Sequence, residues 1–68
     1  MDAWTPLASS NLNAFSYDAA EHILRIRFTS GRTYAYRDVP ENVPKELETA
    51  SSPGQYFNRS IKGSYPET

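Results

Sequence analysis

The hydrophobic pattern is clearest over residues 23–37, where apolar and charged side chains alternate along the chain. Alternation is typical of a strand with one buried face, because successive side chains of a strand point to opposite faces of the sheet. The pattern predicts strands over residues 23–29 and 32–39, joined by a turn at Ser30-Gly31. A weaker alternation predicts a preceding strand over residues 12–17. Before it we expect an extended lead-in, with Trp4 docked on the edge of the domain.

The turn at Ser30-Gly31 leaves two registers open for the second hairpin. A two-residue loop places Tyr34 and Tyr36 on the face that carries the arginines. A longer turn, with Gly31 left-handed in a bulge, shifts the pairing by one residue and moves both tyrosines to the apolar face. We favour the bulged register, because Ser-Gly is unusual in a type I′ turn and because the shift enlarges a small core.

Beyond Val39-Pro40 the apolar positions follow the spacing of a helix. We expect a first helix capped by Asn42, with an apolar stripe formed by Val43, Leu47 and Ala50. A second helix is expected to begin at Pro53 and to end at Gly63. The sequence therefore predicts an α+β domain, with a three-stranded antiparallel meander followed by two short helices packed on one face. Residues 9–65 form the domain in this interpretation, residues 1–8 the lead-in and residues 66–68 a loose tail.

Composition narrows the classes of function. The chain has 68 residues, no cysteine and one histidine, so it predicts one small domain without disulfides or thiolate metal sites. His22 falls in a predicted turn without a positioned partner, and we expect no enzyme activity, no metal and no cofactor. No stretch resembles a signal peptide or a membrane span, which predicts a cytoplasmic protein.

Charge is unevenly distributed although the formal net charge is only −1. Every charge between Leu24 and Arg37 is positive, whereas residues 38–48 are mostly acidic. Arginine neutralises phosphate and tyrosine offers a ring on which a base can stack, so we expect binding of RNA or single-stranded nucleic acid. The candidate residues are Arg25, Arg27, Arg32, Tyr34, Tyr36, Arg37, Arg59 and Lys62.

The bulged register divides these candidates between two surfaces. Arg25, Arg27 and Arg37 then line the open sheet face, while Arg59 and Lys62 form a second patch with Tyr56 and Tyr65. A structural interpretation competes with both, in which these charges only keep the sheet and the helix soluble. The alternative function is a protein interaction module that docks through the open sheet face or the edge of its first strand.

An ordered set of motifs runs through most of the chain. It comprises Ser9-Ser10-Asn11, Tyr17-Asp18, Leu24-x-Ile26-x-Phe28-x-x-Gly31, Tyr34-x-Tyr36, Val39-Pro40, Ala50-x-Ser52-x-Gly54-x-Tyr56-Phe57-Asn58, Ile61 and Tyr65. This set resembles the KTSC domain family, which is named for an appendage of some lysyl-tRNA synthetases and also occurs as small bacterial and phage proteins. The resemblance implies RNA binding through that attachment, which is an associational argument.

Overall fold

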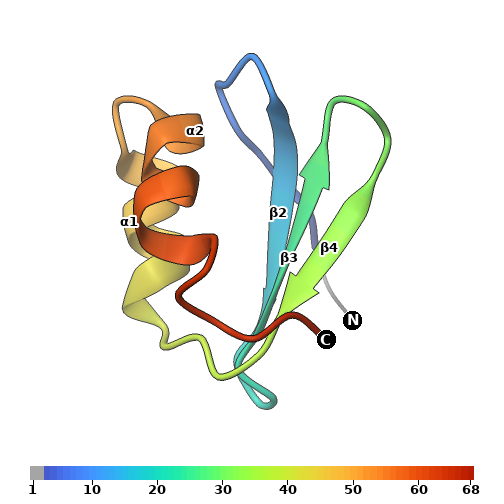
Figure 1. The fold of residues 1–68 in the computed structure, drawn as a ribbon, viewed down its shortest axis with the longest axis vertical. Coiled ribbons are helices and arrows are strands. Elements are labelled where there is room, and N and C mark those ends of the chain that lie inside the picture. Colours follow the sequence, from blue (N-terminus) through green and yellow to red (C-terminus); the bar gives the residue numbers. More distant parts are fainter. Residues whose placement is uncertain (1–2) are drawn as a thin grey trace.

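The structure, a computed structural model, describes residues 3–68 as two layers, with helices on one face of an antiparallel sheet (Figure 1). Within these residues the sheet contains β1 (Thr5–Pro6), β2 (Leu12–Asp18), β3 (Ile23–Phe28) and β4 (Thr33–Tyr36), in sequential order. The helical layer contains α1 (Asn42–Thr49), α2 (Pro53–Tyr56) and η1 (Phe57–Ile61), a turn of π-helix that continues α2. The predicted α+β class is confirmed, but the sheet has four strands rather than three because the lead-in supplies β1.

The bulged register of the second hairpin is confirmed. Tyr34 lies opposite Ile26, and Tyr36 lies opposite Leu24. The turn closes with a hydrogen bond of 2.9 Å from the Gly31 N–H to the Phe28 carbonyl, and Gly31 has a φ of +98°. This backbone conformation favours glycine, since a Cβ is strained there. Both tyrosines therefore face the helical layer.

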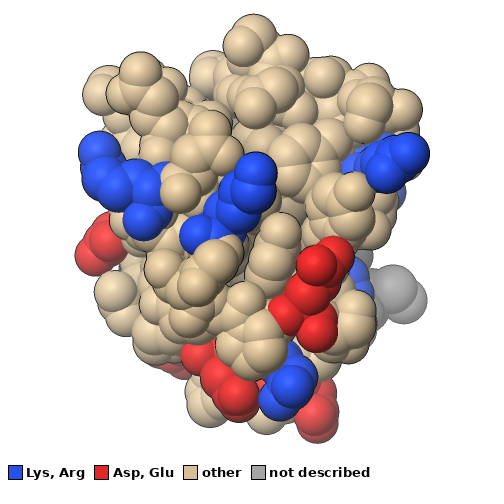
Figure 2. All heavy atoms as spheres, viewed as in Figure 1, with Lys and Arg blue, Asp and Glu red and all other residues tan. Residues whose placement is uncertain are grey.

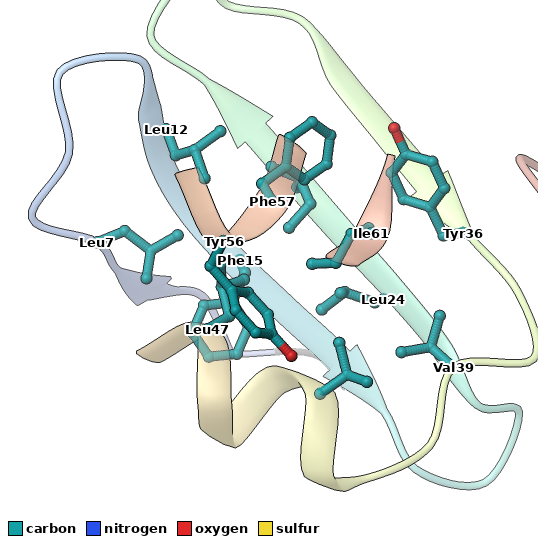
Figure 3. Close-up of a cluster of buried hydrophobic side chains, with 12 residues drawn as sticks. Leu7, Leu12, Phe15, Leu24, Tyr36, Val39, Leu47, Tyr56, Phe57 and Ile61 are labelled. Atoms are coloured by element: carbon teal, nitrogen blue, oxygen red, sulfur yellow. The ribbon is translucent and has the colours of Figure 1, made fainter. Parts of the chain in front are cut away.

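The core lies between the two layers, where side chains of the sheet meet those of the helices (Figure 3). Leu24 and Ile26 of β3 are fully buried, as is Leu47 of α1. Ile61 of η1 closes the core on the helical side. The predicted stripe of α1 is largely confirmed, because Val43 and Leu47 are buried while Ala50 is partly buried.

One of the three expectations about the helix ends is corrected, and the other two are confirmed. Helix α1 begins at Asn42 with Glu41 in the capping position, and the Asn42 side chain donates instead to Glu46, at 3.4 Å. Pro53 does begin the second helix, after Ser52. Gly63 takes a left-handed conformation just beyond η1, with a φ of +81°, as its predicted role requires.

Both edges of the sheet differ from the expectation. The edge of β2 is not open to a partner strand, because Thr5 and Pro6 pair with Phe15 and Ala14. The tail is not loose: Glu67 forms an antiparallel bridge with Tyr36. The Thr68 N–H donates to the Ala35 carbonyl at 2.9 Å, so the tail lies along β4 as a short additional neighbour.

None of the helices formed by residues 3–68 has the length and apolar character needed to cross a bilayer.

Candidate functional site

A groove of about 630 Å³ lies between β4, η1 and the C-terminal tail. Its volume falls within the range of about 300–1,000 Å³ that is typical of small-ligand sites. We call it the aromatic groove, because half of its lining consists of phenylalanine and tyrosine. The lining residues are Asn11, Phe28, Tyr34, Tyr36, Phe57, Asn58, Lys62, Gly63, Tyr65 and Glu67.

The rings of the aromatic groove hold one another in place. Phe28 meets Tyr34 and Phe57 edge to face, with ring centroids 5.5 and 5.3 Å apart. Tyr36 meets Phe57 in the same way at 5.9 Å. Edge-to-face pairs at these separations are favourable beyond the area that they bury. The rings thus form a continuous preformed wall that joins β3, β4 and η1.

The sequence builds this wall through the hairpin register. The bulge at Gly31 turns Tyr34 and Tyr36 toward the helices, where Phe57 meets them. With the two-residue loop both tyrosines would have faced away from η1. The bulged hairpin is therefore the local feature on which the groove depends.

Asn11 lines the groove near its junction with α2, where the backbone of Gly54 approaches closely. A Cβ placed on Gly54 would lie 2.6 Å from the Asn11 side-chain oxygen. That same Oδ1 accepts a hydrogen bond of 2.9 Å from the Ser9 hydroxyl. The Ser9 hydroxyl also accepts from the Leu12 N–H at 3.3 Å, which anchors the turn before β2. Glycine at this position lets α2 pack directly on the Asn11 turn.

Two opposite charges line the aromatic groove from different elements. Lys62 lies at the end of η1, and Glu67 belongs to the tail. Glu67 lies opposite Tyr36 in an antiparallel bridge, so both side chains point to the same side of the sheet. Burial raises the pKa of Tyr36, and the Glu67 carboxylate adds to the effect. The two charged residues make no ion pair with each other.

Asn58 is exposed at the groove, in the first turn of η1. Its amide has no hydrogen-bond partner among residues 3–68. The π-helical turn inserts one extra residue per turn, a distortion that is frequent at functional sites. An unpaired amide at a groove wall is available to bind a ligand.

The structure separates the eight sequence-predicted residues. Tyr34, Tyr36 and Lys62 line the aromatic groove, and Arg32 lies beside it with its Nη1 donating to the Tyr34 hydroxyl at 3.4 Å. Arg59 extends from η1 over the Tyr56 ring, at 6.0 Å from the ring centroid and outside the groove lining.

The remaining arginines lie elsewhere. Arg25 and Arg27 alternate with the buried residues of β3, so they occupy the face away from the helices. The Arg27 guanidinium stacks on the Trp4 ring at 4.1 Å, so Trp4, which directly precedes the edge strand β1, packs on this face. Arg37 is exposed and lies 3.8 Å from Asp38. Figure 2 shows the basic side chains of the groove side standing apart, with acidic ones among them.

The sequence interpretation missed three polar residues of the groove, namely Asn11, Asn58 and Glu67. The first two belong to motifs that we quoted, so their presence in those motifs was a usable signal. Glu67 gave no signal, because its place depends on backbone pairing between the tail and β4. Among the described residues no group of three or more potential metal ligands comes together.

Comparison with known proteins identifies related chains. The family model of the KTSC domain matches residues 8–65. A protein from Tsukamurella paurometabola is 46% identical over 57 residues, which cover 84% of this chain and 85% of that protein. The crystal structure of a KTSC domain protein from Yersinia pestis is similar with a TM-score of 0.94 and 31% identity, covering 100% of this chain and 96% of that one.

The chain is also similar to part of much longer proteins. A lysine–tRNA ligase from Nostoc punctiforme is 43% identical over 56 residues, which cover 82% of this chain but 10% of the ligase. A lysine–tRNA ligase from a second Nostoc strain is 41% identical over the same length.

Proposed function

Because the chain belongs to the KTSC domain family, we propose that it is a non-enzymatic binding module that holds unpaired bases of RNA in the aromatic groove. The observation that carries the proposal is the convergence of separate motifs on one groove. Tyr34-x-Tyr36, Phe57-Asn58 and Tyr65 are distant in the sequence, yet all of them line it.

The shape and chemistry of the groove support a base as ligand. Bases stack on aromatic side chains with a gain of about 1–3 kcal/mol each, and this gain tolerates any base. The groove volume of about 630 Å³ is sufficient for one or two nucleotides, not for a duplex. RNA recognition commonly uses unpaired bases, which can leave the stack and enter such a groove.

The charges around the groove support contact with few phosphates. Lys62 lines it and Arg32 lies beside it, whereas Arg25 and Arg27 occupy the opposite face. Arg32 alone, or Arg32 together with Lys62 where Lys62 contacts a phosphate rather than the base, predicts that the logarithm of the association constant falls against the logarithm of the salt concentration with a slope of about −0.7 to −1.4. This salt dependence is much weaker than that of proteins that bind nucleic acid mainly through a basic surface.

The relatives add an associational argument. Two ligases similar to this chain are named for lysine and tRNA, so in them the domain is joined to a protein that handles RNA. A protein partner is the second candidate function. It is favoured by the net charge of −1, since nucleic-acid-binding domains are usually basic.

The test is a titration of isotope-labelled protein with short single-stranded RNA, followed by amide shifts at low and physiological salt. We expect shifts at Tyr34, Asn58 and Tyr65 that shrink as salt rises. Lys62→Gln should weaken binding, whereas the matched control Lys45→Gln, an exposed lysine on α1, should not.

Two outcomes would overturn the proposal. Shifts confined to β3 around Arg27 would place the RNA on the open face instead. No shifts at low salt would reject RNA and favour the protein partner. A pull-down with the intact chain would then follow, and binding that persists in high salt would indicate an apolar docking surface.

A further inference from the structure

The aromatic groove presents two opposite charges that do not pair with each other. Glu67 is held by backbone hydrogen bonds on either side of it: the Arg37 N–H donates to the Pro66 carbonyl at 3.0 Å and the Thr68 N–H to the Ala35 carbonyl at 2.9 Å. Lys62 comes from η1, a different element. A ligand between them is therefore offered an acceptor on one side and a donor on the other.

This pair of charges restricts what the groove can hold. A bare phosphate at its centre would be repelled by Glu67, and a cationic side chain such as arginine would be repelled by Lys62. The rings of Phe28, Tyr34 and Phe57 require a flat, largely apolar body. The matching ligand is a neutral aromatic ring with N–H donors at one edge and acceptors at another.

From this arrangement we infer that the groove selects guanine over the other RNA bases, with Glu67 accepting from the N1–H and N2–H groups and Lys62 donating to O6 or N7. Guanine alone among the four bases places two N–H donors side by side with acceptors elsewhere on the ring. A carboxylate accepts such a pair of donors in a bidentate manner. Adenine and cytosine each offer a single amino group with a ring-nitrogen acceptor beside it, and uracil offers one N–H between two carbonyls.

The unpaired amide of Asn58 is consistent with this assignment. It lines the same groove and has no partner among residues 3–68. An amide both donates and accepts, so it can complete the contacts of a base edge that Glu67 and Lys62 leave unmet.

The inference rests on the proposed function, and its test separates the two. We would measure dissociation constants for labelled hexamers of uridine in which one central position is guanine, adenine, cytosine or inosine. We expect the guanine hexamer to bind roughly 5- to 150-fold more tightly than the adenine hexamer, as one bidentate contact provides. Inosine lacks the N2 amino group, so it should lose part of this preference.

A variant of the carboxylate tests the assignment from the protein side. Glu67→Gln should reduce the preference for guanine over adenine while leaving the uridine hexamer bound as before. Glu48→Gln, an equal change of charge on the exposed side of α1, serves as the control and should keep the preference. Unchanged amide spectra outside the groove would show that both variants remain folded.

Each result has a distinct meaning. Equal affinities for guanine and adenine, with shifts in the groove, would overturn base selection and leave RNA binding intact. Equal affinities for guanine and inosine would overturn the bidentate role of Glu67. Binding of an arginine-containing peptide in the groove, without binding of any hexamer, would overturn both proposals.

Discussion

The close approach of Gly54 to Asn11 gives a sharp test of how the helical layer packs on the sheet. Replacing Gly54 with alanine would place a Cβ 2.6 Å from the Asn11 Oδ1, whereas ordinary contact begins near 3.4 Å. The oxygen must therefore retreat by about 0.8 Å. Its hydrogen bond with Ser9 opposes this movement.

The cost can be estimated from its parts. Overpacking by a methyl group costs about 1–3 kcal/mol, and losing the Ser9–Asn11 hydrogen bond costs about 0.5–1.5 kcal/mol. Alanine is a better helix former than glycine, which offsets this cost by up to about 1 kcal/mol of stability. We therefore expect Gly54→Ala to lower the free energy of unfolding by about 2 kcal/mol. A domain of this size is expected to have only about 3–10 kcal/mol in total.

The assay is urea unfolding at equilibrium, followed by tyrosine and tryptophan fluorescence, with a second variant as control. In an Asn11→Ala background the obstructing oxygen is absent, so the same Gly54→Ala substitution should stabilise the protein by up to about 1 kcal/mol. The sign of the effect should thus reverse. An equal effect of Gly54→Ala in both backgrounds would refute the steric argument.

Three further predictions concern stability. Burial, aided by a hydrogen bond of 2.8 Å to Glu46, raises the pKa of Tyr56 to about 12. The raised pKa stabilises the fold below pH 10, and this contribution of about 2–3 kcal/mol should be lost between pH 10 and 12. Between pH 10 and 12 the free energy of unfolding should fall less steeply for Tyr56→Phe than for the parent protein. An identical fall in the two proteins would show that the Tyr56 hydroxyl is not its source. Gly31→Ala should lower the free energy of unfolding by about 1–2 kcal/mol, because residue 31 has a left-handed backbone that strains a Cβ. A melting temperature equal to that of the parent would contradict this expectation. Phe28→Ala should lower the free energy of unfolding by about 2–3 kcal/mol, less than the roughly 3–5 kcal/mol of a fully buried ring, because one side of Phe28 faces the groove. Complete unfolding of this variant at 25 °C would contradict that estimate.

The sequence predicted the fold where local patterns decide it. Alternation predicted β3 and β4, and the Ser30-Gly31 pair favoured the register that the structure has. The strand at Thr5–Pro6 was missed because two residues carry no periodicity and their pairing with β2 is a long-range contact. The tail was misjudged for the same reason, as its bonds to β4 follow from where η1 ends and not from its own composition.

The candidate site was predictable only in part. The two tyrosines and Lys62 were named from chemistry, and the register decided where they lie. The arginines of β3 looked equally suited in the sequence, but alternation places them on the face away from the groove. The packing of η1 and the tail against β4 decides which charges share a surface. The spacing of residues in the sequence does not predict this packing.

The occupied sheet edges affect how this domain behaves next to other proteins. A free strand edge is a template for pairing with another chain and hence for aggregation. Here β1 lies along β2, and Pro66 to Thr68 lie along part of β4. The fold thus limits edge-to-edge association with segments of its own chain. A domain protected in this way can be joined to a large enzyme, or stand at high concentration, without recruiting its neighbours into a shared sheet.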